Sequence, residues 1–367
     1  MTRCILALSI LFLTLSAARA EIVVGIAGPM TGSLASLGEQ MRQGAEMAVA
    51  DINAKGGVLG QKLKLAQGDD ACDPKQAVAV ANRLVNQGAV FVSGHFCSGS
   101  SIPASEVYSE ENVLQISPGS TNPIFTDRKL SNVFRVCGRD DQQGAIAAAF
   151  ITKNYNGRYI AIVHDKTAYG KGLADAVRDS LKGKNVKEVL YEAITPGERD
   201  YSALVSKLKA AKADILFFGG YHQEAGLIVR QMRDQDVNAP LMGGDALITK
   251  EFWDITGKSG AGTLLTFNPD PRLLPEAKAV VERFKAKNIK PEGYTLYTYA
   301  TFQVFAQAAA QAGGTKLNQI EPILRKASFN TVLGKLSFDA KGDVQAPGYI
   351  VYEWRDGEYK PLKDKGA

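Results

Sequence analysis

Short apolar runs rich in β-branched residues alternate with longer stretches of helical periodicity through most of the chain. The short runs have the composition of strands buried on both faces, and the stretches between them repeat apolar residues every three or four positions. Strands are expected at 22–27, 63–66, 89–92, 113–116, 159–163, 186–190, 215–218, 241–242 and 263–265. Strands separated by helices are typical of covered parallel sheets, so the pattern predicts an α/β protein.

The helical stretches complete this pattern. The sequence Asp73-Pro74 marks one helix start, because aspartate caps helices and proline suits the first helical position. The alternation restarts after Asp140 and becomes mainly helical after Asn268. Helices are expected at 38–54, 101–110, 275–287, 297–312 and 318–326 and in segments that begin at 73, 201 and 222, and two late strands at 336–338 and 350–354.

The first 20 residues have the features of a secretory signal peptide. Arg3 precedes an apolar run at 5–15, and Ala18-Arg19-Ala20 fits a small-x-small cleavage site. The apolar run is too short to span a membrane, which takes about 20 residues. Cys4 comes before the apolar run, too early for lipid attachment. The sequence therefore predicts an exported, soluble mature protein.

Length and charge limit the possible functions. The remaining 347 residues exceed what a single core usually supports, so two domains are expected. The formal charge of +5 falls to +3 without Arg3 and Arg19, and both signs are interspersed along the chain. This balance offers no basis for nucleic-acid binding.

Three cysteines remain after cleavage: Cys72, Cys97 and Cys137. Cys72 lies in D-D-A-C-D-P-K-Q and Cys97 in G-H-F-C-S-G-S-S. Disulfides persist in oxidising compartments, so Cys72–Cys97 is the expected pair, with Cys137 unpaired. Three buried thiols are the alternative.

The loops that follow the predicted strands carry most of the candidate chemistry, because ligands of open α/β sheets bind beyond the carboxyl ends of the strands. Two loops of the first half are rich in hydroxyls, at 94–101 and 117–122. Residues 98–101 also open a helix, where free N–H groups favour an anion such as a carboxylate. In the second half, Asp245 suits an ammonium. Together these loops predict an α-amino acid ligand, whereas each loop alone is more typical of helix capping or packing.

Four segments are similar to one known family. They are G-A-E-M-A-V-A-D-I-N-A-K-G-G (44–57), D-D-A-C-D-P-K-Q-A-V-A-V-A-N (69–82), I-A-I-V-H-D-K (160–166) and G-G-Y-H (219–222). With them, nearly the whole mature chain resembles the branched-chain (leucine/isoleucine/valine) amino-acid binding proteins of bacterial ABC transporters, which are type I periplasmic binding proteins. The resemblance implies two Rossmann-like lobes with parallel sheets, joined by a three-crossover hinge, and no catalysis.

The resemblance also implies boundaries and partners. Lobe 1 would comprise residues 21–139 and 268–347, and lobe 2 residues 140–267 and 348–367, with crossovers near 138–140, 266–268 and 346–349. It implies a periplasmic monomer that binds a small amino acid and serves an inner-membrane ABC permease, without a cofactor or nucleic acid.

Site residues follow from the same resemblance. Ser98 and Thr121 match the carboxylate donors, and the Gly119 carbonyl, the Thr121 hydroxyl and Asp245 match the ammonium partners. Tyr169 and Tyr221 match contacts of the closing lobe.

Three further positions complete the candidate set. Ser120 falls within the same loop as Gly119 and Thr121. Leu37 stands where the best-known members carry an aromatic residue over the side-chain pocket, and Tyr294 lies in a region that aligns only with a small gap. Asp245 also departs from the family pattern, since those members carry the longer glutamate there.

Two other functions are compatible with such a chain. An exported enzyme could use His95, His164 or His222, each at a strand end, but no nucleophile or metal-ligand spacing accompanies them. Neither a G-x-G-x-x-G nor a Walker motif is present, so no catalytic residue, metal or cofactor is assigned. The same fold could instead bind another small acid, an amide or an aromatic compound, but a ligand without an ammonium would leave Asp245 unpaired.

Overall fold

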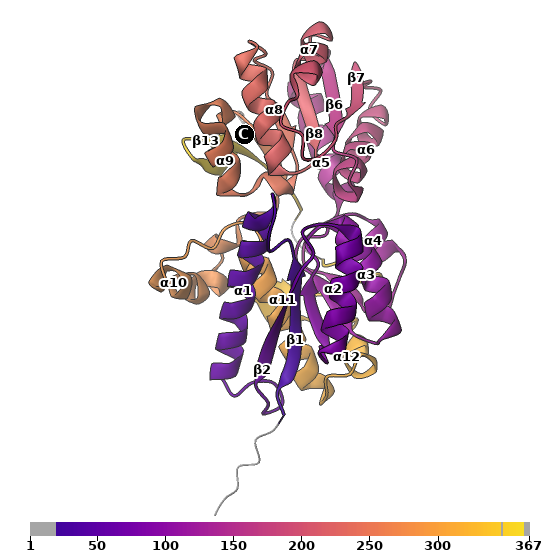
Figure 1. Cartoon of the computed structure of the whole chain (residues 1–367), viewed down its shortest axis with the longest axis vertical. Coiled ribbons are helices and arrows are strands. Elements are labelled where there is room, and N and C mark those ends of the chain that lie inside the picture. Colours follow the sequence, from indigo (N-terminus) through magenta and orange to yellow (C-terminus); the bar gives the residue numbers. More distant parts are fainter. Residues whose placement is uncertain (1–19, 346–347, 363–367) are drawn as a thin grey trace, which may run out of the picture.

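A computed structural model of the chain describes residues 20–345 and 348–362. The predicted signal peptide, apart from Ala20, and Cys4 therefore lie outside the described residues, as do residues 346 and 347 of the expected third crossover. The described chain forms two α/β lobes, one above the other in Figure 1, as the sequence pattern predicts. No helix of the described part combines the length and the apolar character needed to span a bilayer.

The first lobe is built on a five-stranded parallel sheet in the order β2-β1-β3-β4-β5. Its strands are β1 (Ile22–Gly28), β2 (Leu63–Asp69), β3 (Phe91–Gly94), β4 (Leu114–Ser117) and β5 (Val133–Arg135). Its main helices are α1 (Ala35–Ala54), α2 (Pro74–Asn86), α3 (Ser98–Glu110), α4 (Ile124–Asp127), α10 (Lys278–Ala286), α11 (Thr295–Ala312) and α12 (Leu317–Leu324). Helices α1 and α11 pack against each other, and so do α2 and α3, so both faces of the sheet are covered.

The second lobe has a seven-stranded sheet in the order β14-β13-β10-β9-β8-β6-β7. Its parallel strands are β6 (Ile160–His164), β7 (Leu190–Ala193), β8 (Ile215–Gly219), β9 (Leu241–Gly243) and β10 (Leu264–Phe267). Strands β13 (Ile350–Arg355) and β14 (Glu358–Pro361) add to the β10 edge in antiparallel pairing. The helices are α5 (Asp140–Asn154), α6 (Ala168–Lys182), α7 (Ser202–Ala210), α8 (His222–Asp234) and α9 (Lys250–Thr256).

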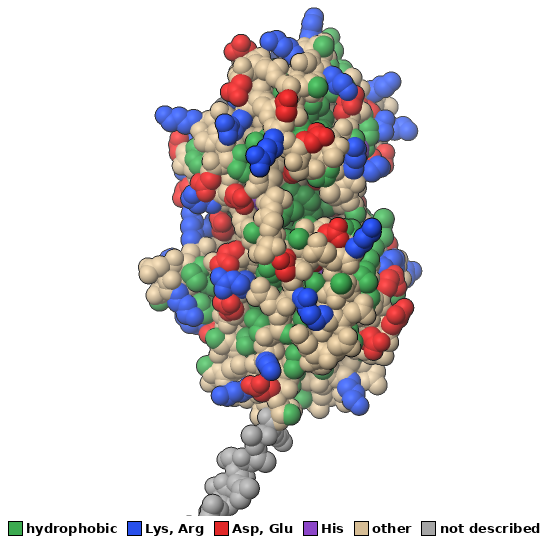
Figure 2. Space-filling model, in the orientation of Figure 1, with side chains coloured by type: hydrophobic (Ala, Val, Ile, Leu, Met, Phe, Trp, Pro, Cys, Tyr) green, Lys and Arg blue, Asp and Glu red, His purple; other side chains and the backbone are tan. Residues whose placement is uncertain are grey.

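Short elements complete the described part of the chain. A two-stranded antiparallel sheet joins β11 (Phe329–Thr331) to β12 (Gly334–Leu336), and four 3-10 turns are η1 (Asp245–Leu247), η2 (Gly257–Gly260), η3 (Pro271–Leu273) and η4 (Pro275–Ala277). The chain enters the second lobe between β5 and α5, leaves it after β10, and returns to it before β13. Figure 2 shows basic and acidic side chains interspersed over the face it displays.

Some element bounds differ from the sequence-based expectation. A strand expected at 186–190 is in fact β7, which begins at Leu190. This edge strand is half-exposed and carries Tyr191 and Glu192, so it lacks the apolar run of an interior strand. The helix expected at 101–110 begins three residues earlier, at Ser98, directly after Cys97.

Candidate functional site

Loops at the carboxyl ends of both sheets face each other between the lobes and enclose a small cavity. Its walls are Phe96, Ser98 and Gly119 from the first lobe and Tyr169, Tyr221, Asp245 and Ala246 from the second. Its volume is about 10 Å³, which is room for about one water molecule. Five of the residues predicted from the sequence thus line one cavity.

The lobes touch each other around this cavity. Asn122 Nδ2 of the first lobe donates a hydrogen bond of 2.6 Å to the Ala168 carbonyl at the start of α6. Elsewhere between the lobes, Ser36 Oγ lies 3.5 Å from His222 Nε2 and 3.5 Å from Thr249 Oγ1. The structure therefore represents a closed arrangement of the lobes.

Asp245 is the acidic group of the cavity. It opens the turn η1 after Gly243-Gly244, and only 2% of its surface is exposed. Its carboxyl accepts hydrogen bonds from Tyr169 Oη (2.8 Å), Gln143 Nε2 (2.9 Å) and Tyr294 Oη. Burial raises the pKa of Asp245, while these three bonds act in the opposite direction. Because all three partners are neutral donors, a cation in the cavity would supply the missing counter-charge.

A second buried carboxyl lies close to the first. Asp140, at the start of α5, is fully buried, and its Oδ1 accepts a hydrogen bond of 3.2 Å from Gln143 Nε2. Burial first, and then the charge of Asp245, hold the pKa of Asp140 well above its usual range. Two carboxylates this close repel each other, so the charge of Asp245 disfavours the ionised form of Asp140.

The first-lobe wall offers hydrogen-bond donors. Helix α3 begins at Ser98, and the N–H groups of Ser98 and Gly99 precede its first helical hydrogen bonds, which Ser100 and Ser101 make to the Cys97 carbonyl. Ser98 Oγ accepts a bond of 3.2 Å from the Asn122 N–H, which leaves its proton to donate. This wall suits an anionic group.

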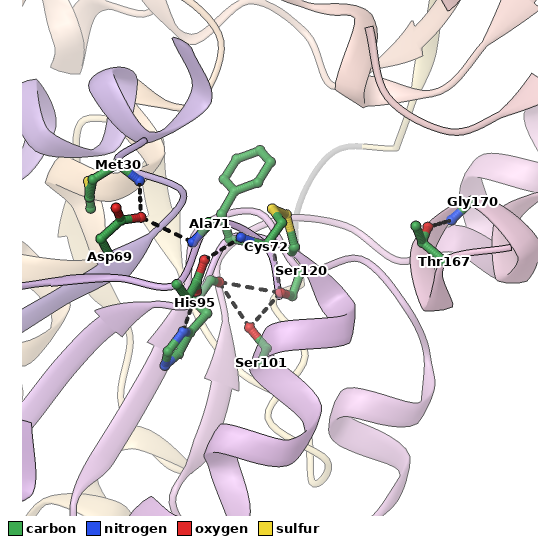
Figure 3. The surroundings of a disulfide bond; sticks show 12 residues. Met30, Asp69, Ala71, Cys72, His95, Ser101, Ser120, Thr167 and Gly170 are labelled. Carbon is green, nitrogen blue, oxygen red and sulfur yellow. Dashed lines mark hydrogen bonds and ion pairs between the residues drawn. A yellow bond between two sulfur atoms is a disulfide. The ribbon is translucent and has the colours of Figure 1, made fainter. Parts of the chain in front are cut away.

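The neighbouring hydroxyls are placed differently from Ser98. Ser120 Oγ lies 2.6 Å from Ser101 Oγ and donates to the Phe96 carbonyl at 2.8 Å, so it joins two loops of the first lobe (Figure 3). Thr121 is fully buried, and its carbonyl accepts a bond of 2.9 Å from the Asp140 N–H. Neither belongs to the residues found to line the cavity.

The hydrophobic wall of the cavity includes Phe96, not Leu37 as the resemblance implied. The Phe96 ring meets the Tyr294 ring edge to face, with centroids 4.9 Å apart. A Cβ at position 119 would lie 2.7 Å from the Phe96 ring, so a larger residue there would displace that ring. Leu37 is fully buried in the core, and among the described residues it lines neither this cavity nor the cleft outside it.

Sequence reasoning missed Phe96 and Ala246 in the wall of the cavity and Gln143 behind it. Phe96 could have been found from its position between His95 and Cys97 in a strand-end loop. Gln143 carried no such signal, because a glutamine within a helix is usually a surface residue.

A larger cleft of about 670 Å³ adjoins the cavity and shares Tyr221 with it. Its first-lobe wall includes the Cys72–Cys97 disulfide, and its second-lobe wall includes Asp165 and Glu224. Figure 3 shows the disulfide and, across the opening, Thr167 at the start of α6. The disulfide confirms the pairing expected from the sequence, and Cys137 is a buried free cysteine.

Each of the three histidines contacts polar groups. His95 Nδ1 lies 2.5 Å from Asp70 Oδ2, and Nε2 lies 3.0 Å from Tyr108 Oη, all in the interior below the disulfide. His164 Nδ1 accepts the Lys166 N–H, and His222 Nε2 lies 3.0 Å from Glu251 Oε2. Within the residues that the structure describes, no group of three or more His, Cys, Asp or Glu side chains could hold a metal ion.

The chain matches known proteins over nearly its whole length. A family model described as periplasmic binding protein matches residues 21–358. An amino acid binding protein of Pseudomonas aeruginosa is 52% identical over 349 residues, which is 94% of this chain and 93% of that protein. A Leu/Ile/Val-binding protein homolog 2 of Brucella abortus is 48% identical over 340 residues, or 92% of each chain.

Solved structures give the same picture of the fold. The leucine binding protein LivK of Thermotoga maritima matches with a TM-score of 0.86 and 26% identity, over 93% of this chain and 98% of that one. The branched-chain amino acid transporter substrate binding protein LivJ of Streptococcus pneumoniae, in complex with isoleucine, matches with a TM-score of 0.85 and 27% identity over the same shares.

Proposed function

The chain belongs to the periplasmic binding protein family, and on that premise we propose that it is a periplasmic receptor for an aliphatic α-amino acid. The receptor holds its ligand between the two lobes, acts as a monomer and delivers the ligand unchanged to an inner-membrane ABC permease. The relatives named as Leu/Ile/Val-binding proteins support a branched-chain ligand.

One observation carries this proposal: the cavity places a buried carboxyl opposite a helix start. Asp245 forms one wall, and Ser98 at the first turn of α3 forms another. A zwitterion satisfies both walls at once, with its ammonium on Asp245 and its carboxylate on the N–H groups and hydroxyl of Ser98. A simple carboxylic acid would satisfy only the second.

The aromatic walls control how large the ligand's side chain can be. In the closed arrangement the cavity holds about one water, so ligand entry requires the lobes to separate. Phe96 and Tyr294 meet at its border and limit the room left on closure. This observation favours a second candidate ligand class, the smaller aliphatic amino acids such as alanine, over the same zwitterion site.

The three chain crossings between the lobes suit a hinge motion that opens and closes the cleft. We propose residues 21–139 and 268–347 as one moving body and 140–267 and 348–367 as the other, with ligand closing the hinge between them. Small-angle scattering with and without saturating ligand tests this. A smaller radius of gyration with ligand is expected, and an unchanged radius would count against the motion.

A thermal-shift screen of the twenty amino acids tests the function itself. A ligand at 100 times its dissociation constant adds about 2.7 kcal/mol to the free energy of unfolding. Leucine, isoleucine, valine and alanine should include the strongest ligands, whereas 4-methylpentanoate, which is leucine without its ammonium, should give no shift. Recovery of the bound amino acid unchanged would distinguish a receptor from an enzyme. Failure of every amino acid to stabilise the protein would refute the proposal.

A further inference from the structure

Two hydrogen bonds join the side chain of Gln143 to Asp245. Gln143 lies in the first turn of α5, fully buried, where the chain has just entered the second lobe. Its Nε2 donates to Asp245 Oδ1 at 2.9 Å, and its Oε1 accepts the Asp245 N–H at 2.8 Å. The two ends of one side-chain amide therefore hold both the carboxyl and the backbone of Asp245.

The surroundings of Gln143 fix which way its amide points. Oε1 also accepts a hydrogen bond of 2.6 Å from Thr266 Oγ1 on β10, and Nε2 lies 3.2 Å from Asp140 Oδ1. A backbone N–H can only donate, so a rotated amide would bring two donors together at Asp245. The Asp245 N–H therefore fixes the amide oxygen of Gln143 on its own side, and the amide nitrogen faces the Asp245 carboxyl.

The segment that carries Asp245 needs such a support. Asp245 begins a three-residue turn and follows two glycines, Gly243 and Gly244, so no long element holds it. A Cβ at position 244 would lie 2.5 Å from Tyr169 Oη and 3.1 Å from Gln143 Oε1, which shows how closely these side chains approach the turn.

We propose that Gln143 is a positioning residue for the ammonium half of the site, an inference that rests on the amino-acid receptor function proposed above. Gln143 does not belong to the residues found to line the cavity, so it acts through Asp245. Gln143 also connects Asp245 to the first lobe. It donates to Asp140, and the Asp140 N–H donates to the carbonyl of Thr121 in the loop that follows β4. The first turn of α5 thereby joins the loops that face the two ends of the ligand.

Calorimetry with the best amino acid from the screen tests this inference. Gln143→Met keeps the side-chain length but removes both hydrogen bonds, and it should raise the dissociation constant by about ten-fold or more, the scale for a bond to a charged group. Thr266→Val removes only the hydroxyl that holds Oε1 and should raise it about two- to five-fold. Gln142→Met, on the exposed side of the same turn, is the control and should stay within about two-fold of the parent.

A double-mutant cycle separates positioning from general damage to the fold. In an Asp245→Asn background, Gln143→Met should change the dissociation constant by less than about two-fold, because its route to the ligand is already lost. Parental affinity in Gln143→Met, or effects that multiply in the double variant, would overturn the inference. If Gln143→Met does not fold, Thr266→Val decides, and an unchanged affinity there would overturn it equally. A parent protein that binds no amino acid would instead refute the receptor function.

Discussion

Replacing Asp245 should separate ligand binding from the stability of the empty protein. Asp245→Ala removes the acidic group of the closed cavity, and Asp245→Asn keeps its shape but not its charge. In the empty protein, burial raises the pKa of Asp245, so its ionised form costs folding free energy. The same negative charge attracts the ammonium of the ligand. Loss of the charge should therefore weaken ligand binding and stabilise the empty protein.

The magnitude follows from the burial of the pair. Asp245 is 2% exposed and has neutral partners, so a ligand ammonium beside it would form a buried charge pair. Truncating one partner of such a pair costs about 2–5 kcal/mol. A loss of 2 kcal/mol corresponds to a rise of about 30-fold in the dissociation constant. Asp245→Asn should also bind more weakly, because a hydrogen bond can survive but the charge cannot.

Two assays measure the two effects. Calorimetry with the best amino acid gives the dissociation constant, and thermal melting without ligand gives the stability, which should rise in Asp245→Asn. Asp254→Asn is the matched control, since Asp254 is exposed on α9 and contacts Lys250. If Asp245→Ala binds its amino acid as tightly as the parent, the assignment of the ammonium site is wrong.

Three further predictions concern the walls of the cavity and cleft. Tyr221→Phe removes one neutral hydroxyl at the cavity and should weaken binding by about 0.5–1.5 kcal/mol, less than Asp245→Ala; calorimetry showing the reverse order would contradict this. Reduction of Cys72–Cys97, which are 25 positions apart, should lower the free energy of unfolding by about 3–4 kcal/mol, and equal urea midpoints with and without reductant would disprove it. Burial raises the pKa of Asp165 from 3.8 to about 6, so its ionised form destabilises the fold above pH 6, and the penalty disappears as the pH falls from 6 to 3.8. Asp165→Asn should therefore be more stable than the parent at pH 8, by up to roughly 3 kcal/mol, and no more stable at pH 3.5; urea unfolding that shows the same difference at both pH values would contradict the assignment.

Interior strands were predictable because burial on both faces leaves a plain apolar run. Strand β8 (Ile215–Gly219) is buried throughout and matches the expected 215–218 almost residue for residue. The edge strand β14 (Glu358–Pro361) is largely exposed, alternates charge with apolar side chains and was not predicted. Where solvent covers one side of a strand, composition alone does not distinguish it from a loop.

The site was predictable as far as it depends on strand ends. Ser98, Tyr221 and Asp245 follow buried strands, and parallel sheets bring such positions to one edge. The hydrogen bond from Tyr294 to Asp245 depends instead on how α11 packs against the hinge, and nothing local in the sequence encodes it. The role of Gln143 was equally hidden from the sequence, because this residue of helix α5 has its partners on β10 and η1.

The interleaved order of the chain also has a consequence for its synthesis. Helix α1 of the first lobe packs on α11, and the Tyr294 N–H bonds to Gln40, 254 positions earlier. The second sheet is completed even later in synthesis, because β10 pairs with β13 (Ile350–Arg355), which lies near the end of the chain. A nascent chain thus finishes neither core before translation is nearly complete, and such long-range contacts form slowly. The signal peptide predicted from the sequence would have such a chain cross a membrane unfolded, and late completion of both cores would keep it unfolded for longer.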